Sequence, residues 1–214
     1  MIKVNLEQYN NACYIVAGGP SLKGFDWNKL RGQFVIAINR AYEVLPDAQI
    51  VYFTDKDFWE RHKEAMLQHN GQLMRGALNP SKEENHPDVQ MYKLTGAQGL
   101  ETNEGQLKHG SNSTYAATNL AAVHLGFKRI YLLGVDMSWG KKGDKSTSHW
   151  HDGHKRIDAE SGYLNMIKNW KTIVQPLKDM GVEVWNANPE SALQCFPKCT
   201  IERALANKPL KVNP

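Results

Sequence analysis

Short runs of apolar residues, each ending on a polar residue or a glycine, recur through the first quarter of the chain. Residues 14–17, 34–38 and 50–53 are continuous apolar runs that are too short for helices. Such runs are typical of strands that are buried on both faces of a parallel sheet. Residues 26–30, 41–45 and 58–70 have the spacing or the capping residue of helical segments. This alternation predicts an α/β fold, with a parallel sheet wound by crossovers.

The middle of the chain is less regular. Residues 72–74 and 89–94 are weaker strand candidates, and residues 95–110 hold four glycines and few apolar residues, which predicts a mobile flap or a loop beside an acceptor. An alanine-rich helix is expected to begin at Ser113 or Thr114, either of which would cap it, and to end near residue 125. Its Ser/Thr-rich start is also a good phosphate site. Strands at 128–133 and 182–185 follow, separated by a long helix over 158–180 that Pro176 would kink or end early.

The first strand candidate ends on Gly18-Gly19-Pro20-Ser21. Glycine permits positive φ and a close approach to the backbone, Pro20 fixes the next φ, and Ser21 would cap the segment that follows. The turn is either a plain strand-to-helix connection or a cradle of free N–H groups for an anion. Ligands bind beyond the carboxyl ends of parallel strands. The polar residues after the first three strands are therefore expected to face one crevice: Ser21, Asn39, Thr54 and Asp55.

Composition narrows the class of protein. The 214 residues are enough for one well-cored α/β domain, expected over 1–205 with a polar tail over 206–214, and 41% hydrophobic residues is an ordinary globular value. The formal charge of +4 fits an anionic ligand such as a nucleotide, whereas no dense Lys/Arg block singles out nucleic acid. Three cysteines are too few for a disulfide framework, and no signal-peptide or membrane-spanning run is present. We therefore expect a cytoplasmic protein without a membrane span.

Two clusters of titratable residues are candidates for chemistry. His149, His151 and His154 fall within six residues, but their spacing matches no zinc signature, and neither Cys nor Glu accompanies them. We interpret them as a general base or a phosphate partner. Asp55 and Asp57 form an Asp-x-Asp after a strand candidate. Asp55 is either a helix cap or, with Asp57, part of a divalent metal site.

These segments together resemble a known group of enzymes. The chain is similar to the family 42 bacterial sialyltransferases and to a related group that contains the MptE-like pterin pyrophosphokinases, the flagellin-modifying Maf proteins and a phage or prophage branch. The similarity covers most of the chain outside residues 60–110. It rests on motifs that are weak singly but specific in their shared order: Gly-Gly-Pro-Ser-Leu-Lys23 with Asp26-Trp-Asn-Lys-Leu30, Asn39 after a strand, Ser113-Thr114-Tyr115 before a helix ending Leu125-Gly-Phe, Arg129-Ile-Tyr-Leu-Leu-Gly-Val-Asp136, Gly153-His154, and Asn188-Pro-x-Ser191.

The resemblance implies a Rossmann-like fold with a mainly parallel twisted sheet, helices on both faces, a flexible lid at about 138–156 and a variable insertion at about 71–110. It implies a nucleotide-activated sugar as donor, a CMP-sugar above all, and a lid histidine, here His154, as the base that deprotonates an acceptor hydroxyl. His151 and His149 are further candidates for that base. Donor-binding roles would fall on these residues: Gly18, Gly19, Pro20, Ser21, Asn39, Thr54, Ser113, Thr114 and Asp136.

Two departures from the sialyltransferases leave the donor open. Gly18 stands where they have Asn, and Thr54, followed by Asp55, stands where they have another Asn. Mg²⁺ held by Asp55 and Asp57 would suit the alternative of an MptE-like, ATP-dependent pyrophosphokinase that acts on a hydroxymethyl group. A further alternative is a phage nucleotide-binding protein involved in DNA-base modification. The acceptor under these hypotheses is a saccharide, a protein or a modified DNA base, and the family often forms homo-oligomers.

Overall fold

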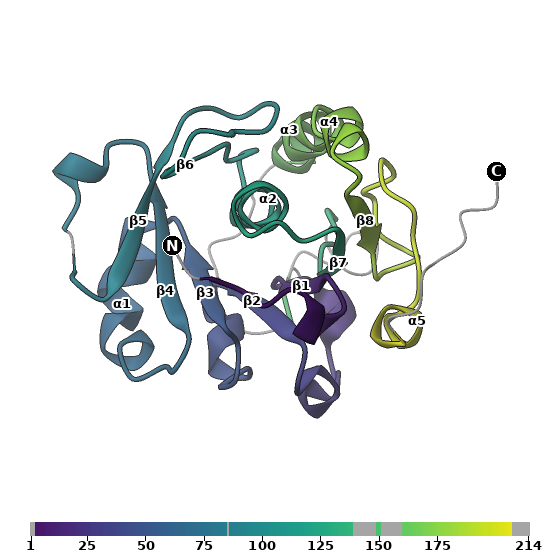
Figure 1. Ribbon diagram of the computed structural model, residues 1–214, viewed down its shortest axis with the longest axis horizontal. Coiled ribbons are helices and arrows are strands. Elements are labelled where there is room, and N and C mark those ends of the chain that lie inside the picture. Colours follow the sequence, from purple (N-terminus) through teal and green to yellow (C-terminus); the bar gives the residue numbers. More distant parts are fainter. Residues whose placement is uncertain (1–2, 85, 139–148, 151–159, 207–214) are drawn as a thin grey trace.

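Figure 1 shows the computed structural model of the chain, which describes residues 3–84, 86–138, 149–150 and 160–206. Within these residues the strands form one eight-stranded sheet in the order β6-β5-β4-β3-β2-β1-β7-β8, and every neighbouring pair is parallel. The predicted α/β fold with a Rossmann-like parallel sheet is therefore confirmed. The strands are β1 Ala12–Val16, β2 Phe34–Ile38, β3 Ile50–Phe53, β4 Gln72–Ala77, β5 Val89–Leu94, β6 Gln106–Leu107, β7 Arg129–Leu133 and β8 Glu183–Asn186.

The central strands are continuous apolar runs because both faces of the sheet are covered. In β1, Cys13 and Ile15 pack into the core on one face, and Tyr14 and Val16 pack into the core on the other. All residues of β1 and β2 are buried. A strand enclosed on both sides has no solvent face for polar residues, which is why apolar runs rather than alternation marked it in the sequence.

Helices cover both faces of the sheet, as expected (Figure 1). α2 (Ser113–Asn119), α3 (Glu160–Lys171) and α4 (Val174–Asp179) pack on one face, and α1 (Lys56–Met66) and α5 (Ile201–Leu205) pack on the other. None of the described helices is long and apolar enough to cross a lipid bilayer. Short 3₁₀ turns supply further connections: Glu7–Tyr9, Pro20–Leu22, Trp27–Leu30, Asn39–Glu43 and Pro80–Lys82.

The strand order reverses next to β1. From β1 the chain moves outward strand by strand to β6 at one edge of the sheet, and it then returns through α2 to β7, on the other side of β1. The turns that follow β1 and β7 are therefore neighbours. The N–H of Ala17 donates to the carbonyl oxygen of Leu133 at 2.9 Å, which continues the ladder beyond the ends of both strands. Such a reversal is where parallel α/β sheets open a crevice for a ligand.

The predicted cap of α2 is wrong, whereas the predicted early end of the helix before Pro176 is confirmed. Neither Ser113 nor Thr114 caps α2: the side chain of Asn112 does, by accepting the N–H of Tyr115, and the helix continues as a π-helical turn over Leu120–His124. The long helix expected over 158–180 is divided within its described part, and the break lies at residues 172–173, ahead of Pro176. Because Pro176 has no N–H to donate to the preceding turn, the helix restarts with Pro176 in the first turn of α4, where that donor is not needed.

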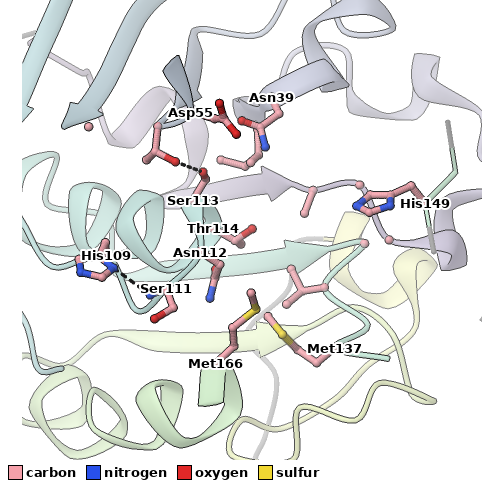
Figure 2. Close-up of a pocket in the computed structure, with 18 of the residues that line it drawn as sticks. Asn39, Asp55, His109, Ser111, Asn112, Ser113, Thr114, Met137, His149 and Met166 are labelled. Atoms are coloured by element: carbon pink, nitrogen blue, oxygen red, sulfur yellow. Dashed lines mark hydrogen bonds between the residues drawn. The ribbon is translucent and has the colours of Figure 1, made fainter. Parts of the chain in front are cut away.

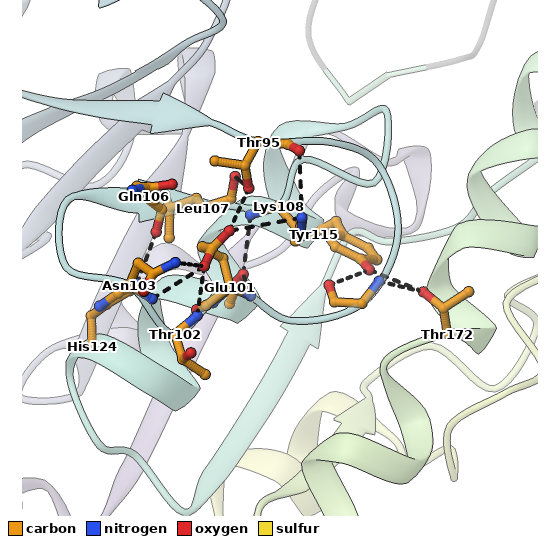
Figure 3. A network of polar contacts seen from close by, with 12 residues as sticks. Thr95, Glu101, Thr102, Asn103, Gln106, Leu107, Lys108, Tyr115, His124 and Thr172 are labelled. Carbon is orange, nitrogen blue, oxygen red and sulfur yellow. Dashed lines mark hydrogen bonds and ion pairs between the residues drawn. The ribbon is translucent and has the colours of Figure 1, made fainter.

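Residues 95–110, predicted as a mobile flap or a loop beside an acceptor, form a hydrogen-bonded wall beside α2 (Figure 3). The carboxylate of Glu101 accepts from the Thr95 hydroxyl at 2.6 Å and from the Asn103 side chain at 2.9 Å. The buried amide of Asn119, on α2, bonds to the backbone of Glu101 and of Lys108. Polar contacts rather than apolar packing stabilise this segment. Its composition, which is poor in apolar residues, therefore suggested a loop. Residues 71–110, predicted as a variable insertion, supply β4, β5 and β6 of the sheet.

Candidate functional site

A cavity of about 590 Å³ lies along the carboxyl edge of the sheet (Figure 2). Its described lining comes from the ends of β7, β1, β2, β3, β4 and β5 and from the start of α2. The volume is within the range of small-molecule sites. Most of the residues predicted to bind a donor line it: Gly18, Gly19, Pro20, Asn39, Thr54, Ser113, Thr114 and Asp136. The crevice expected from the sequence and the cavity in the structure are thus the same place.

The glycine turn after β1 is held against the turn after β7. The N–H of Gly19 donates to the carbonyl oxygen of Gly134 at 2.8 Å, and a Cβ at position 19 would overlap Gly134 and Asp136. Gly19 has a φ of −61°, so it is needed for this close approach and not, as the sequence had suggested, for a positive φ. Gly134 does require one, with a φ of +67°.

Ser21, unlike its neighbours in the turn, is not among the described lining residues. Its N–H and its hydroxyl both donate to the carboxylate of Asp136, at 2.8 and 2.6 Å, and the side chain of Asn188 donates to the same carboxylate at 2.7 Å. Asp136 is buried, and these three donors compensate its negative charge. The Ser21 donors that could have cradled an anion are therefore occupied by a carboxylate. Candidate donors for an anion are therefore sought among the other lining residues.

The first turn of α2 offers such donors. Of its N–H groups, that of Tyr115 is taken by Asn112, whereas those of Ser113 and Thr114 have no acceptor among the described residues. The hydroxyl of Ser113 shares a hydrogen bond of 3.0 Å with the hydroxyl of Thr54, which ties the start of α2 to the end of β3 (Figure 2). Open N–H groups and hydroxyls at the start of a helix suit a phosphate.

Three lining residues other than glycine have a left-handed backbone. They are Asn39, Ser111 and Met137, with φ values of 51°, 65° and 52°. Such conformations cost about 1 kcal/mol or more and cluster at functional sites. In addition, Oδ1 of Asn39 is buried and has no hydrogen-bond partner among the described residues. A buried amide oxygen without a donor is well placed to accept an N–H or O–H of a ligand.

His149 lines the cavity, whereas His151 and His154 lie outside the described residues. Figure 2 shows His149 at one end of the cavity view and His109 at the other, with the start of α2 between them. The predicted histidine cluster thus contributes His149 to the described site.

Trp150 fastens His149 to the glycine turn. Its backbone N–H donates to the carbonyl oxygen of Gly18, and its indole Nε1–H donates to that of Ala17, both at 3.0 Å. Its ring packs on Trp27 with centroids 5.0 Å apart. Two hydrogen bonds to carbonyl oxygens and one ring contact thus fix Trp150, and they fix the backbone beside His149 with it.

Asp55 is a helix cap, one of the two roles predicted for it. Its Oδ1 accepts the N–H of Asp57 at 2.8 Å and that of Phe58 at 3.2 Å. Asp55 lines the cavity, but Asp57 is not among the described lining residues. The described part of the chain has no group of three or more His, Cys, Asp or Glu side chains placed to hold a metal ion. The predicted metal role of Asp55 and Asp57 stays a prediction.

Sequence reasoning missed several lining residues, among them His109, Ser111, Met137, Tyr163 and Met166. Burial and the neighbouring Lys108 lower the pKa of His109, so its imidazole stays neutral at physiological pH. Burial, with a contribution from Asp136, raises the pKa of Tyr163. The glycine at position 110 was the available signal for a special turn before Ser111, but it lay in a stretch interpreted as a flap.

No protein-family model, curated protein or solved structure matches this chain. The resemblance to sialyltransferases and MptE-like enzymes is therefore a hypothesis, and function is argued from the cavity itself.

Proposed function

We propose that this protein is a glycosyltransferase that uses a nucleotide-activated sugar, a CMP-sugar above all. The observation that carries the proposal is a single cavity, at the reversal of a parallel sheet, that is lined by both the first turn of α2 and His149. Nucleotides commonly bind at such reversals. The open N–H groups of Ser113 and Thr114 suit the phosphate, and Oδ1 of Asn39 suits a donor group of the nucleoside.

In this proposal His149 is the general base. Its imidazole takes the proton of an acceptor hydroxyl while that oxygen bonds to the anomeric carbon of the donor. The bond between this carbon and the phosphate oxygen breaks, and the nucleotide leaves with the electron pair. The N–H groups of Ser113 and Thr114 stabilise the charge that develops on the leaving phosphate.

The charges around the cavity favour a donor with one phosphate. The described lining includes Lys56 but no arginine, and the carboxylates of Asp55 and Asp136 are already hydrogen-bonded. A diphosphate or triphosphate brings more negative charge and would need more compensating positive charge than Lys56 supplies. This supports a CMP-sugar over the substrates of an ATP-dependent pyrophosphokinase.

Thermal unfolding with nucleotides tests the donor. CMP, CDP, UDP, GDP, ADP and ATP are each added with and without Mg²⁺. We expect CMP alone to stabilise the protein by about 2.7 kcal/mol at a concentration of 100 times its Kd, which corresponds to several degrees for a domain of this size. Stabilisation by ATP or a diphosphate that requires Mg²⁺ would instead support the pyrophosphokinase.

Release of CMP from CMP-N-acetylneuraminic acid tests the base. We expect His149→Ala to lower turnover by about 10²- to 10⁴-fold, the usual contribution of a general base, and to leave stabilisation by CMP intact. His86→Ala, outside the described lining, is the matched control. Full turnover by the His149 variant would overturn the assignment of the base, and His151→Ala and His154→Ala would then identify it. Nucleotide binding without turnover of any donor would support a binding protein.

A further inference from the structure

The donor that we propose has three parts in a row, and the cavity has matching groups in a row. Its sugar, which carries the anomeric carbon, is followed by one phosphate and then by the nucleoside. Figure 2 shows His149 and His109 at the two ends of the cavity view, with the start of α2 between them. A base at His149 places the sugar at that end, and the N–H groups of Ser113 and Thr114 place the phosphate in the middle. The nucleoside then lies at the end that holds His109.

The lining at this end comes from β4 and β5. Leu78 follows β4, Leu94 ends β5, and the N–H of His109 donates to the carbonyl oxygen of Gly96, two residues beyond β5, at 2.8 Å. Neighbouring strands are about 4.8 Å apart, so four spacings place β5 about 19 Å from β1 and its glycine turn. A nucleotide-sugar therefore extends along the edge of the sheet from the reversal toward β5. Asn39, which follows β2, is then beside the ribose.

A buried arginine supports this end of the cavity. Arg75, on β4, is 1% exposed, and its Nε has no hydrogen-bond partner among the described residues. Burying a charge is costly, and an apolar side chain often serves stability as well or better at such a position. Nη2 of Arg75 donates to Oε2 of Glu83 at 2.8 Å, and Glu83, whose side chain is 25% exposed, lines the cavity. The arginine thus holds a carboxylate on the cavity wall and compensates its negative charge, which lets an anionic nucleotide bind beside it.

His109 adds a hydrogen-bond donor to this acceptor. Its Nδ1 accepts the N–H of Ser111 at 3.0 Å, so the neutral ring carries its proton on Nε2. Leu94 and Leu78, which is 62% exposed, add apolar surface to the same end. Apolar surface with one acceptor and one donor suits a flat base whose edge carries an amino group and a carbonyl oxygen.

We propose that Glu83, positioned by the buried Arg75, accepts the amino group of the donor's nucleobase and selects cytosine over uracil. This inference rests on the proposed function, because it assigns the nucleoside end of the same donor. A glutamate or aspartate is the side chain that pairs with the N4 amino group of cytosine. Uracil in the same position turns its O4, an acceptor, toward the carboxylate, so both acceptors are left unpaired. His109 donates to O2, which both bases share, so it contributes affinity rather than selectivity.

Binding of CMP and UMP tests the inference, because these nucleotides differ only in the base. Titration calorimetry gives the Kd of each. We expect wild type to bind CMP about tenfold more tightly than UMP, or better. We expect Glu83→Gln to bring the two Kd values within about twofold, because a carboxamide offers a donor to uracil and still offers an acceptor to cytosine. Glu84→Gln, the same change at the adjacent exposed residue, is the control and should keep the wild-type ratio.

Arg75→Met tests the positioning role of the arginine. Methionine fills the buried position without a charge, and Glu83 keeps its carboxylate but loses the group that holds it. We therefore expect the preference for CMP to fall toward that of Glu83→Gln. Arg75→Met combined with Glu83→Gln leaves no buried charge unpaired, so it is expected to fold, and it should show no further fall. A wild-type preference in Arg75→Met would overturn the role of Arg75.

The outcomes separate this inference from the proposed function. Equal affinity of wild type for CMP and UMP would overturn the inference, and so would a preference for CMP that survives both Glu83→Gln and the double variant. Release of CMP from CMP-N-acetylneuraminic acid would in either case leave the proposed function standing. Binding of neither nucleotide, together with no release of CMP, would overturn the proposed function and this inference together.

Discussion

At the scale of single residues, Gly19 shows how closely the two halves of the sheet meet. Its N–H reaches the carbonyl oxygen of Gly134 across the reversal, and there is no room for a Cβ between them. At Gly19 itself the cavity lining has no side chain, which lets a ligand approach the backbone closely there. The carboxylate of Asp136 fixes the same wall through Ser21.

Gly19→Ala is expected to destabilise the protein by about 3 kcal/mol, because the new methyl group meets the backbone carbonyl oxygen of Gly134 and the hydrogen-bonded carboxylate of Asp136. Urea unfolding measures the loss. Gly32→Ala is the control: position 32 has a φ of +78° but open space around it, so strain alone should cost about 1 kcal/mol. If the Gly19 variant is no less stable than the Gly32 variant, the turns after β1 and β7 can move apart at little cost in free energy.

At the scale of elements, the carboxylate of Glu101 is one of the groups that hold the wall over residues 95–110, beside the amide of Asn119. The Thr95 hydroxyl and then the backbone N–H of Asn103 hold the pKa of Glu101 below its usual value, with help from Lys108. Glu101 therefore stabilises the fold fully above its unfolded pKa, about 4.3, and this contribution is lost as the pH falls through the lower folded value. The wall carries His109 and Ser111 into the cavity, so its stability is a property of the site.

We expect Glu101→Gln to cost about 2 kcal/mol at pH 7 and less as the pH falls from about 5 to 3. Urea unfolding across that range gives the difference from wild type. Glu104→Gln removes an exposed carboxylate from the same segment and should change stability little at any pH. A Glu101 difference that is constant with pH would mean that its charged form is not what holds the wall.

Trp150 links another segment to the glycine turn. Trp150→Phe keeps a ring against Trp27 but loses the indole donor to Ala17. If the indole positions His149, CMP release should fall about tenfold while the Kd for CMP, measured by titration, changes little. Trp185→Phe is matched, because Nε1 of Trp185 is buried without a hydrogen-bond partner among the described residues. Equal activity of both variants would leave Trp150 as packing only.

Most of the fold could be predicted from the sequence because helices cover both faces of the central strands. The runs that became β1, β2 and β3 are apolar without interruption, and each ends on a polar or glycine residue. The ordered structure of residues 95–110 could not be predicted, since hydrogen bonds to Asn119, a residue distant in sequence, contribute to it. The early end of the helix ahead of α4 could be predicted from Pro176, which acts on the turn preceding it.

The site was partly readable for a similar reason. Asn39 and Thr54 follow strands, so topology alone brings them to one edge. The competition between Asp136 and an anion for the donors of Ser21 could not be foreseen, because it depends on two turns more than a hundred residues apart. The ion pair between Glu83 and Arg75 gave no signal either, since it depends on an arginine buried where a strand pattern predicts an apolar residue.

At the scale of the whole molecule, β1 is the strand on which both halves depend. It pairs with β2 on one side and with β7 on the other, and its end forms the glycine turn of the cavity. Cys13 lies within it, fully buried, and burial raises the pKa of its thiol. Since the thiolate is the reactive form, alkylation of Cys13 requires the sheet to open.

Alkylation of Cys13 is therefore expected to report on global unfolding and on occupancy of the cavity. Cys195→Ser with Cys199→Ser leaves Cys13 as the sole thiol. A ligand that binds the native state alone lowers the unfolded population by a factor of 1 + [L]/Kd, so CMP at 100 times its Kd should slow labelling about 100-fold when reclosing is fast. Mass spectrometry follows the modification by iodoacetamide over time, with urea as a control that accelerates it. If CMP raises the melting temperature but leaves the labelling rate unchanged, Cys13 is reached by a local opening that the bound nucleotide does not oppose. The cavity and the centre of the sheet would then be energetically separate, contrary to the close contact between the turns after β1 and β7.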